Sequence, residues 1–191
     1  GELVCLDGGC MPAGVREPVA GDLVVSEIMF NPAGPADDDG EWFEIHNTAA
    51  DPVLLSQCTV ADGALDIRGL AAPEVGAYIE AGGYLVFVRN PDVALNGGIA
   101  NARGFSFGLT NSGDELVVKC GDVEMDRVDY SVDGFPSDIQ GKSIQLDPGR
   151  LTPAANDEGQ AWCHALETYP IGAGESGERG TPGAPNTLCG Q

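Results

Sequence analysis

The sequence predicts an all-β fold of many short strands. Its 191 residues include 28 Gly and 13 Pro, and runs of Val, Ile, Thr, Phe and Tyr lie between them. Short β-prone runs between frequent turn residues are typical of all-β chains. No stretch of a dozen residues shows convincing helical periodicity. The length suits one ordinary domain with a core of its own.

The first two strands are predicted on either side of a loop rich in Pro, Gly and Asp. Apolar-rich segments cover residues 23–30 and 42–45, and the side chains of a strand alternate between two faces. Phe43 and Ile45 therefore point to one face, which we assign to the core. The opposite face is expected to meet water or a partner, and it carries Trp42, Glu44 and His46.

The loop at residues 31–40 is a candidate calcium site because it contains three consecutive carboxylates. Calcium binds several oxygen ligands and accepts flexible loops. The spacing differs from that of an EF-hand, where ligands alternate, and a solvated acidic loop is the simpler interpretation. The candidate ligands are Asp37, Asp38, Asp39 and Asp62.

Further strands are predicted along the rest of the chain. A third strand begins at Val53 and reaches Asp62, and it places Cys58 where a buried cysteine can bridge to a facing sheet. The apolar run at residues 84–88 suits a central strand that is buried on both faces. A hairpin at residues 115–118 and 123–130 and a last strand at residues 143–146 follow.

The C-terminal segment at residues 180–186 is too rich in Gly and Pro to form a core of its own. We expect an aromatic anchor and a disulfide to hold this segment against the rest of the domain.

The charge of the chain argues against nucleic acid as a partner. Thirty acidic and nine basic residues give a formal net charge of -21, and the basic residues are scattered, so a phosphate backbone is repelled. We interpret the acidity as solubility in a salty or exposed setting. The longest apolar run is far too short to span a bilayer, so we expect no membrane span.

Six cysteines, an even number, indicate disulfides and an oxidising compartment. There is no CxxC pair, and with two histidines a zinc site needs an unusual ligand set. Disulfides persist outside the cytosol, so we expect a secreted protein, either extracellular or at the cell surface. Cys5 and Cys10 either close a loop on each other or attach the N-terminal arm to the main body. The cysteines are Cys5, Cys10, Cys58, Cys120, Cys163 and Cys189.

Nothing in the sequence points to catalysis, and we expect no enzyme activity. The chain lacks HExxH, and His46 and His164 stand apart from any nucleophile. No Gly-rich phosphate loop follows a strand and opens a helix. Trp42, Tyr78 and Tyr84 are candidates for an aromatic sugar-binding platform, although packing against loops is the simpler interpretation.

Seven sequence blocks, in order, closely resemble those of bacterial lamin-tail domains. The resemblance covers about residues 22–186 and implies an immunoglobulin-like β-sandwich. It also implies no shared catalytic residues, and in secreted bacterial proteins the family looks like an accessory or structural module. The blocks are SEIMFNP (26–32), EWFEIHN (41–47), VLLSQCTVADG (53–63), AGGYLVFVRN (81–90), FGLTNSGDELVV (107–118), SIQLDP (143–148) and GTPGAPN (180–186).

One departure from the family pattern is Cys58, at a position where the family usually has Trp. The departure implies that a core aromatic has been exchanged for a cross-link, most simply to Cys120. A long-loop disulfide contributes about 3–5 kcal/mol, which is comparable with a well-packed aromatic. The remaining pairs, among many connectivities that six cysteines allow, are then Cys163 with Cys189, as a clamp on the terminal segment, and Cys5 with Cys10.

Two hypotheses about function follow. The first is a non-enzymatic secreted structural or adhesive protein that self-associates into a filament or matrix through its sandwich edges and terminal arms. The second is a calcium-dependent module that binds glycan or a cell-wall polymer. We assign residues 1–21 to an N-terminal arm, leaving open whether copies exchange it, and residues 22–190 to the sandwich with its C-terminal clamp.

Overall fold

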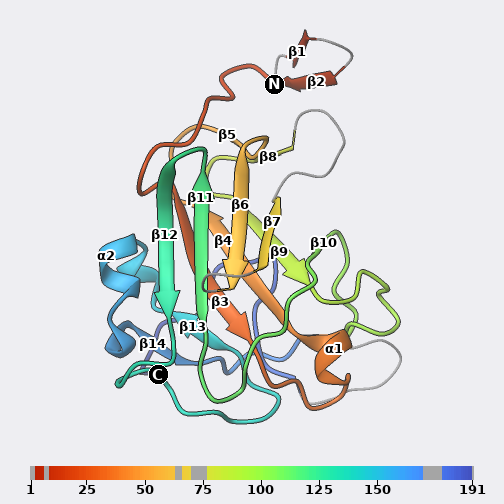
Figure 1. The fold of residues 1–191 in the computed structure, drawn as a ribbon, viewed down its shortest axis with the longest axis vertical. Coiled ribbons are helices and arrows are strands. Elements are labelled where there is room, and N and C mark those ends of the chain that lie inside the picture. The colour runs from red at the N-terminus through yellow and green to blue at the C-terminus, as the bar shows by residue number, and fades with distance from the viewer. Residues whose placement is uncertain (1–2, 7–8, 63–65, 70–76, 170–177, 191) are drawn as a thin grey trace.

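The computed structural model describes residues 3–6, 9–62, 66–69, 77–169 and 178–190. Figure 1 shows a β-sandwich, in which a six-stranded and a four-stranded sheet pack face to face. The fold class predicted from the sequence, a disulfide-braced, all-β immunoglobulin-like sandwich, is confirmed. Within the described part of the chain, no helix has the length and apolarity needed to cross a membrane.

The larger sheet contains the two strands that the sequence placed first. Its strand order is β10-β9-β4-β3-β13-β14, and all neighbours are antiparallel except β9 and β10. Its strands are β3 (Leu23–Met29), β4 (Trp42–Asn47), β9 (Tyr84–Val88), β10 (Arg103–Gly104), β13 (Ile144–Leu146) and β14 (Trp162–His164).

The smaller sheet has the order β12-β11-β6-β7 and is antiparallel throughout. Its strands are β6 (Cys58–Asp62), β7 (Asp66–Gly69), β11 (Glu115–Cys120) and β12 (Val123–Asp129). Two further pairs of strands are β1 (Leu3–Leu6) with β2 (Gly9–Pro12), and β5 (Val53–Leu54) with β8 (Tyr78–Ile79). The helical turns are α1 (Asp37–Gly40), η1 (Pro148–Arg150), α2 (Pro153–Asn156) and η2 (Gly159–Ala161).

The main hydrophobic core lies between the two sheets. Phe43 is fully buried and stacks on Phe87 of the next strand, with ring centroids 4.9 Å apart. The prediction that Phe43 and Ile45 face the core is confirmed. Both sheets contribute to the core, which includes Leu23, Val25, Ile28, Phe43, Ile45, Val60, Leu116, Val118, Val128, Ile144 and Leu146.

Two strand predictions are wrong. The segment from Val53 to Asp62 is divided, because β5 pairs with β8 while β6 pairs with β7 and β11. The apolar strand β9 is second from the edge of its sheet, beside the two-residue β10, and only its last three residues are buried. The central strands are β4 and β3, and every residue of both is buried although several are polar.

The Cys58–Cys120 disulfide links neighbouring strands rather than facing sheets. The two residues lie opposite each other in the register of β6 and β11, with an S–S distance of 1.99 Å. The prediction that Cys58 bridges to a facing sheet is therefore wrong, although its partner is the one that the family pattern implied. A second disulfide joins Cys163 of β14 to Cys189.

The N-terminal hairpin places Cys5 opposite Cys10 in the backbone register of β1 and β2. The side chains of both residues lie outside the described part of the structure, so a bond between them stays a prediction. Further along the arm, Arg16 pairs with Val53 and forms an ion pair with Asp22 at 2.6 Å. The proposed boundary between residues 21 and 22 also stays a prediction.

Candidate functional site

The outer face of the six-stranded sheet is covered by the chain's own C-terminal segment. We call residues 178–190 the C-terminal strap. Trp42 and Glu44 are fully buried, and a Cβ atom on Gly180 would lie 2.8 Å from Trp42 Cζ2 and 3.0 Å from Glu27 Oε1. The strap thus lies directly on the sheet, and only glycine fits at position 180. The face that we expected to meet water or a partner is covered by another part of the same chain.

Two buried glutamates lie side by side on this face. Glu27 and Glu44 are directly opposite in the register of β3 and β4, just after a bulge at Ser26, and both are fully buried. Glu27 Oε1 accepts hydrogen bonds from Ser143 Oγ at 2.5 Å and from the Thr181 backbone N–H at 3.0 Å. Its Oε2 accepts from Thr181 Oγ1 at 2.9 Å. Glu27 therefore ties the strap to β3 and to Ser143, the residue just before β13.

Glu44 holds the next part of the strap. Its Oε2 accepts from the Gly183 backbone N–H at 2.7 Å, and its Oε1 accepts from Ser26 Oγ at 2.7 Å. Every one of these contacts uses a carboxylate oxygen as an acceptor, which is the role that carboxylates fill in helix caps and turns. The glutamate pair thus supplies fixed acceptors for a segment that makes few strand hydrogen bonds of its own.

The pKa values of the pair are raised because both groups are buried together. Burial raises the pKa of Glu27 to about 7, against the lowering effect of hydrogen bonds from Ser143 and Thr181. Burial, and then the charge of Glu27, raises the pKa of Glu44 well above its usual range. Two like charges on opposing positions of a sheet repel each other, so the folded state favours protonation of the pair.

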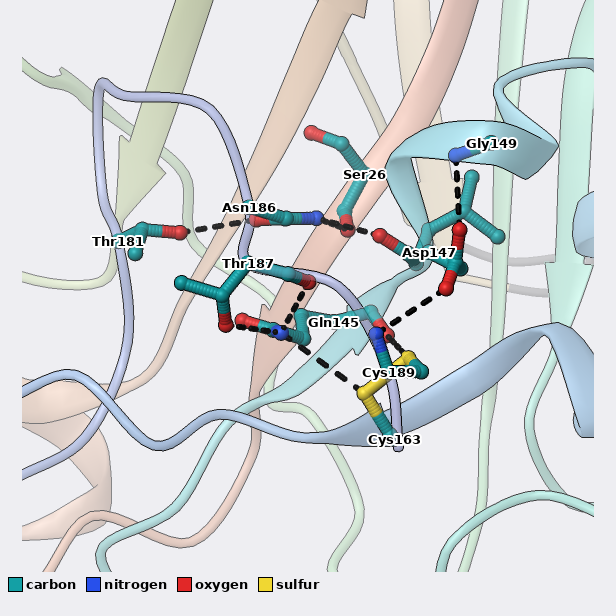
Figure 2. The surroundings of a disulfide bond; sticks show 10 residues. Ser26, Gln145, Asp147, Gly149, Cys163, Thr181, Asn186, Thr187 and Cys189 are labelled. Carbon is teal, nitrogen blue, oxygen red and sulfur yellow. Dashed lines mark hydrogen bonds between the residues drawn. A yellow bond between two sulfur atoms is a disulfide. The ribbon is translucent and has the colours of Figure 1, made fainter. Parts of the chain in front are cut away.

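Asn186 binds the strap to the backbone of two neighbouring strands (Figure 2). Its Nδ2 donates to the Ser26 carbonyl of β3 at 2.8 Å and to the Leu146 carbonyl of β13 at 2.9 Å. Its Oδ1 lies 2.8 Å from Thr181 Oγ1, whose single proton is shared with Glu27 Oε2. One amide therefore satisfies two buried backbone carbonyls and closes the turn of the strap.

The end of the strap is fixed covalently beside this amide. Figure 2 shows the Cys163–Cys189 disulfide next to Gln145, whose Nε2 donates to the Thr187 carbonyl at 2.8 Å. The Cys189 backbone N–H donates to Asp147 Oδ2 at 3.0 Å. A disulfide that closes a loop of this length contributes about 3–4 kcal/mol by restricting the unfolded chain. The expected anchoring of the terminal segment by a disulfide is thus present in the structure.

The start of the strap holds the loop between β3 and β4. Glu178 is fully buried, and its Oε1 accepts from the backbone N–H groups of Ala33 and Gly34 at 2.5 and 2.6 Å. Tyr169, the last described residue before the strap, packs edge-to-face on Trp42 and accepts a hydrogen bond from its indole N–H at 3.0 Å. These contacts extend the covered face from β4 to the loop.

The four candidate calcium ligands are divided between two elements. Asp37, Asp38 and Asp39 form the single turn α1, whereas Asp62 ends β6 in the other sheet. Asp38 Oδ1 accepts from Arg89 at 2.8 Å, and Asp39 Oδ1 accepts from Asn90 at 2.7 Å. Among the described residues, no three His, Cys, Asp or Glu side chains form a group suited to a metal ion. Calcium binding stays a prediction.

The two histidines contact backbone carbonyls. His46 stacks on Tyr84 with ring centroids 4.2 Å apart, and its Nδ1 donates to the Gly83 carbonyl at 3.1 Å. Burial lowers the pKa of His46, partly offset by this hydrogen bond. His164 Nε2 lies 2.8 Å from the Ser137 carbonyl. Each histidine ring thus contacts a backbone carbonyl of a neighbouring segment, which is typical of residues that pack the fold.

The described geometry defines an immunoglobulin-like sandwich whose outer sheet face is closed by its own C-terminus. The family model of the Lamin Tail Domain matches residues 16–131, which is 116 of the 191 residues. The chain therefore belongs to the lamin tail domain family, a family of immunoglobulin-like, non-catalytic domains. Searches of curated proteins and of solved structures find no match.

The family match ends before the strap begins. We expected the resemblance to extend to about residue 186, but β13, β14 and the strap lie beyond residue 131. Sequence reasoning also missed Glu27, Glu178 and Asn186 as residues that hold the strap. The available signal was the GTPGAPN block, which contains Thr181 and Asn186, although nothing in it names the glutamates as partners.

Proposed function

We propose that this protein is a non-enzymatic, secreted structural or adhesive module that self-associates into an extracellular or cell-surface assembly. Its membership of a non-catalytic, immunoglobulin-like family supports an interaction module. The disulfides Cys58–Cys120 and Cys163–Cys189 support an oxidising location. The carboxylates Glu27, Glu44 and Glu178 hold the chain's own backbone, so recognition falls to the surface of the sandwich.

The N-terminal hairpin is the observation that carries self-association. In the described part of the chain, β1 and β2 pair only with each other. An isolated two-stranded hairpin is at best marginally stable in water, so docking onto a sheet edge of another copy would stabilise it. The sandwich offers such an edge in β12, which pairs with β11 alone.

Light scattering and electron microscopy of the purified chain test this proposal. We expect a defined oligomer or filaments, and we expect deletion of residues 1–12 to return the protein to a monomer. The melting temperature of the shortened chain serves as the folding control. A wild-type protein that stays monomeric at high concentration, with and without calcium, would overturn the proposal.

A calcium-dependent module for glycan or cell-wall polymer is the second candidate. The gathering of Asp37, Asp38 and Asp39 on the single turn α1 favours it, since adjacent carboxylates attract hard cations. Calorimetry with calcium, followed by melting with and without chelator, tests this function, because a ligand that binds the folded state raises its stability. If calorimetry shows no heat of binding and the chelator does not shift the melting temperature, calcium is excluded as the cofactor.

A further inference from the structure

A crevice between β12 and α2 lies outside the strap. Its volume is about 270 Å³, below the roughly 300–1,000 Å³ of sites for drug-sized ligands. A space of this size suits a single side chain or a small organic ion with a short aliphatic chain. The residues that line it are Glu124, Met125, Asp126, Arg127, Pro153, Ala154 and Asp157.

Asp126, which lines this crevice, is a buried carboxylate with one oxygen that lacks a hydrogen-bond partner. Its side chain is only 2% exposed, and its Oδ2 accepts from the Val25 backbone N–H at 2.6 Å and from Asn156 Nδ2 at 2.7 Å. Its other oxygen, Oδ1, is buried without a hydrogen-bond partner, and so is Oδ1 of the adjacent Asn156. Buried acceptors without donors are costly, so the geometry calls for a group that donates hydrogen bonds.

The charge of the crevice selects a cation as that donor. The lining contains three carboxylates and one guanidinium, a balance of two negative charges when all are ionised. The guanidinium of Arg127 is already paired with Glu115 and Glu124. Asp157 is exposed at the end of α2, and in the described structure no ion pair involves it.

The apolar part of the lining limits which kind of cation fits the crevice. Pro153 and Ala154 border the acidic groups, and an aliphatic stem can lie along such a surface while its charged end reaches a buried acceptor. An ammonium is compact and carries three donors, whereas a guanidinium is broad and planar. A divalent metal is less suited, because the described residues hold no group of three or more metal-ligating side chains.

We propose that this crevice binds a primary alkylammonium group, with the ammonium donating to Asp126 Oδ1 and the stem lying against Pro153 and Ala154. Two sources carry this chemistry: the lysine side chain of a partner peptide, and a free aliphatic diamine. The proposal does not depend on self-association, since it concerns one copy of the chain and its own crevice.

Titration of the isotope-labelled full chain, followed by amide NMR shifts, tests the proposal. The probes are acetyl-Ala-Lys-Ala-amide, the same peptide with norleucine in place of lysine, and 1,5-diaminopentane. We expect saturable shifts in β12 and α2 with the lysine peptide and none with the norleucine peptide. Tighter binding of the diamine identifies a free amine as the source, whereas tighter binding of the peptide identifies a partner chain. Shifts that fail to saturate with both amines, or that norleucine reproduces, overturn the proposal.

Three variants with the same change of charge locate the site. Asp126→Asn is expected to weaken binding by about tenfold or more, the effect of losing a buried charge-assisted hydrogen bond. Asp157→Asn, at an exposed position, is expected to weaken it about two- to fivefold without affecting folding. Asp122→Asn, in the exposed turn between β11 and β12, is the control and leaves affinity unchanged. Equal affinities for Asp157→Asn and the control overturn the proposal even if Asp126→Asn does not fold.

Acidification gives a readout that needs no variant. Burial raises the pKa of Asp126 to about 6, aided by the charge of Asp157 and opposed by hydrogen bonds from Val25 and Asn156 and by the nearby Arg127 backbone N–H. The charged groups facing it are Asp157 from α2 and Glu124 and Arg127 from its own strand. A proton on Asp126 competes with the ammonium, so affinity should fall several-fold between about pH 7.5 and about pH 5. An affinity that does not change with pH contradicts the assignment to Asp126.

Discussion

The two faces of the six-stranded sheet are buried by opposite means. The inner face is closed by apolar packing against the second sheet, as at Phe43, where burial itself supplies the driving force. The outer face is closed by hydrogen bonds from the strap to Glu27 and Glu44, and from Asn186 of the strap to the carbonyls of Ser26 and Leu146. Apolar packing tolerates exchange between apolar side chains of similar volume, whereas a buried polar network is destabilised when one hydrogen-bond partner is lost. The two faces should therefore respond differently to substitution.

A cavity in the inner face should cause the largest loss of stability. Phe43→Ala removes a fully buried ring that stacks on Phe87 and packs on Phe105. Truncations of this kind cost about 3–5 kcal/mol. Denaturant unfolding should show the loss, and hydrogen exchange should accelerate in both sheets together because the core unfolds as one unit. Exchange that accelerates in the strap alone would contradict this account of the core.

Removal of the strap disulfide should have a more local effect. Replacement of Cys163 and Cys189 by Ser removes a cross-link with a sequence separation of 26 residues, worth about 3–4 kcal/mol in the loop-entropy description. Hydrogen exchange should accelerate first at residues 180–189 and leave β4 and β11 protected. The Cys58→Ser, Cys120→Ser pair is the matched comparison, since its cross-link lies inside the four-stranded sheet. Identical exchange patterns for the two pairs would show that the strap is not a separate unit.

Loss of one strap amide should be nearly as costly as loss of its covalent anchor. Asn186→Ala leaves the carbonyls of Ser26 and Leu146 buried and unpaired, at a cost of about 2–3 kcal/mol. Asn111→Ala, in the turn before β11, deletes the same group from a half-buried position and should change stability by about 0.5 kcal/mol or less. Chemical denaturation of the two variants gives the comparison. Equal stabilities would mean that the strap is held by its disulfide alone.

The contrast between the faces also explains how far the sequence could predict the structure. Alternation predicted the inward direction of Phe43 and Ile45, because an apolar residue at a strand position has one favourable side. The same alternation placed Glu44 and His46 on the opposite face correctly, but it left open whether water or a partner covers that face, since a glutamate on a strand is usually solvated. The burial of Glu44 depends on a residue 139 positions later, Gly183. Local pattern carries no information about a pairing that distant.

The crevice beside β12 was beyond sequence reasoning for the same physical reason. Asp126 is one of thirty acidic residues and shares its strand with other charged side chains. Its special state arises from Val25 and Asn156, which reach it from β3 and α2. Disulfide pairing was more accessible, because cysteine has few uses in an oxidising compartment. Even so, the family pattern gave the partner of Cys58 and not the sheet in which the bond lies.

The dependence of stability on pH should be the smallest effect. It tests whether burial of the two carboxylates Glu27 and Glu44 side by side has an electrostatic cost. The folded pKa of Glu27, about 7, exceeds the ordinary value of an unfolded glutamate, so the folded state binds protons more tightly. The associated stability is complete below the unfolded pKa and is lost as the pH rises through about 7. Glu41 and Asp126, with pKa values raised by burial to about 7 and about 6, act in the same direction. The protein should therefore be more stable at about pH 5 than at about pH 7.5, by on the order of 1–3 kcal/mol.

The contribution of the pair can be separated from that of the other carboxylates. Glu44→Gln removes the charge that faces Glu27 while keeping a side chain of the same shape, so the slope of stability between about pH 5 and about pH 7.5 should decrease. Glu17→Gln, at an exposed position of the arm, changes the net charge equally and should leave the slope as it is. Unfolding in urea at several pH values measures both. If the two variants share one slope, then the outer face is not under electrostatic strain, and hydrogen bonding alone distinguishes it from the core.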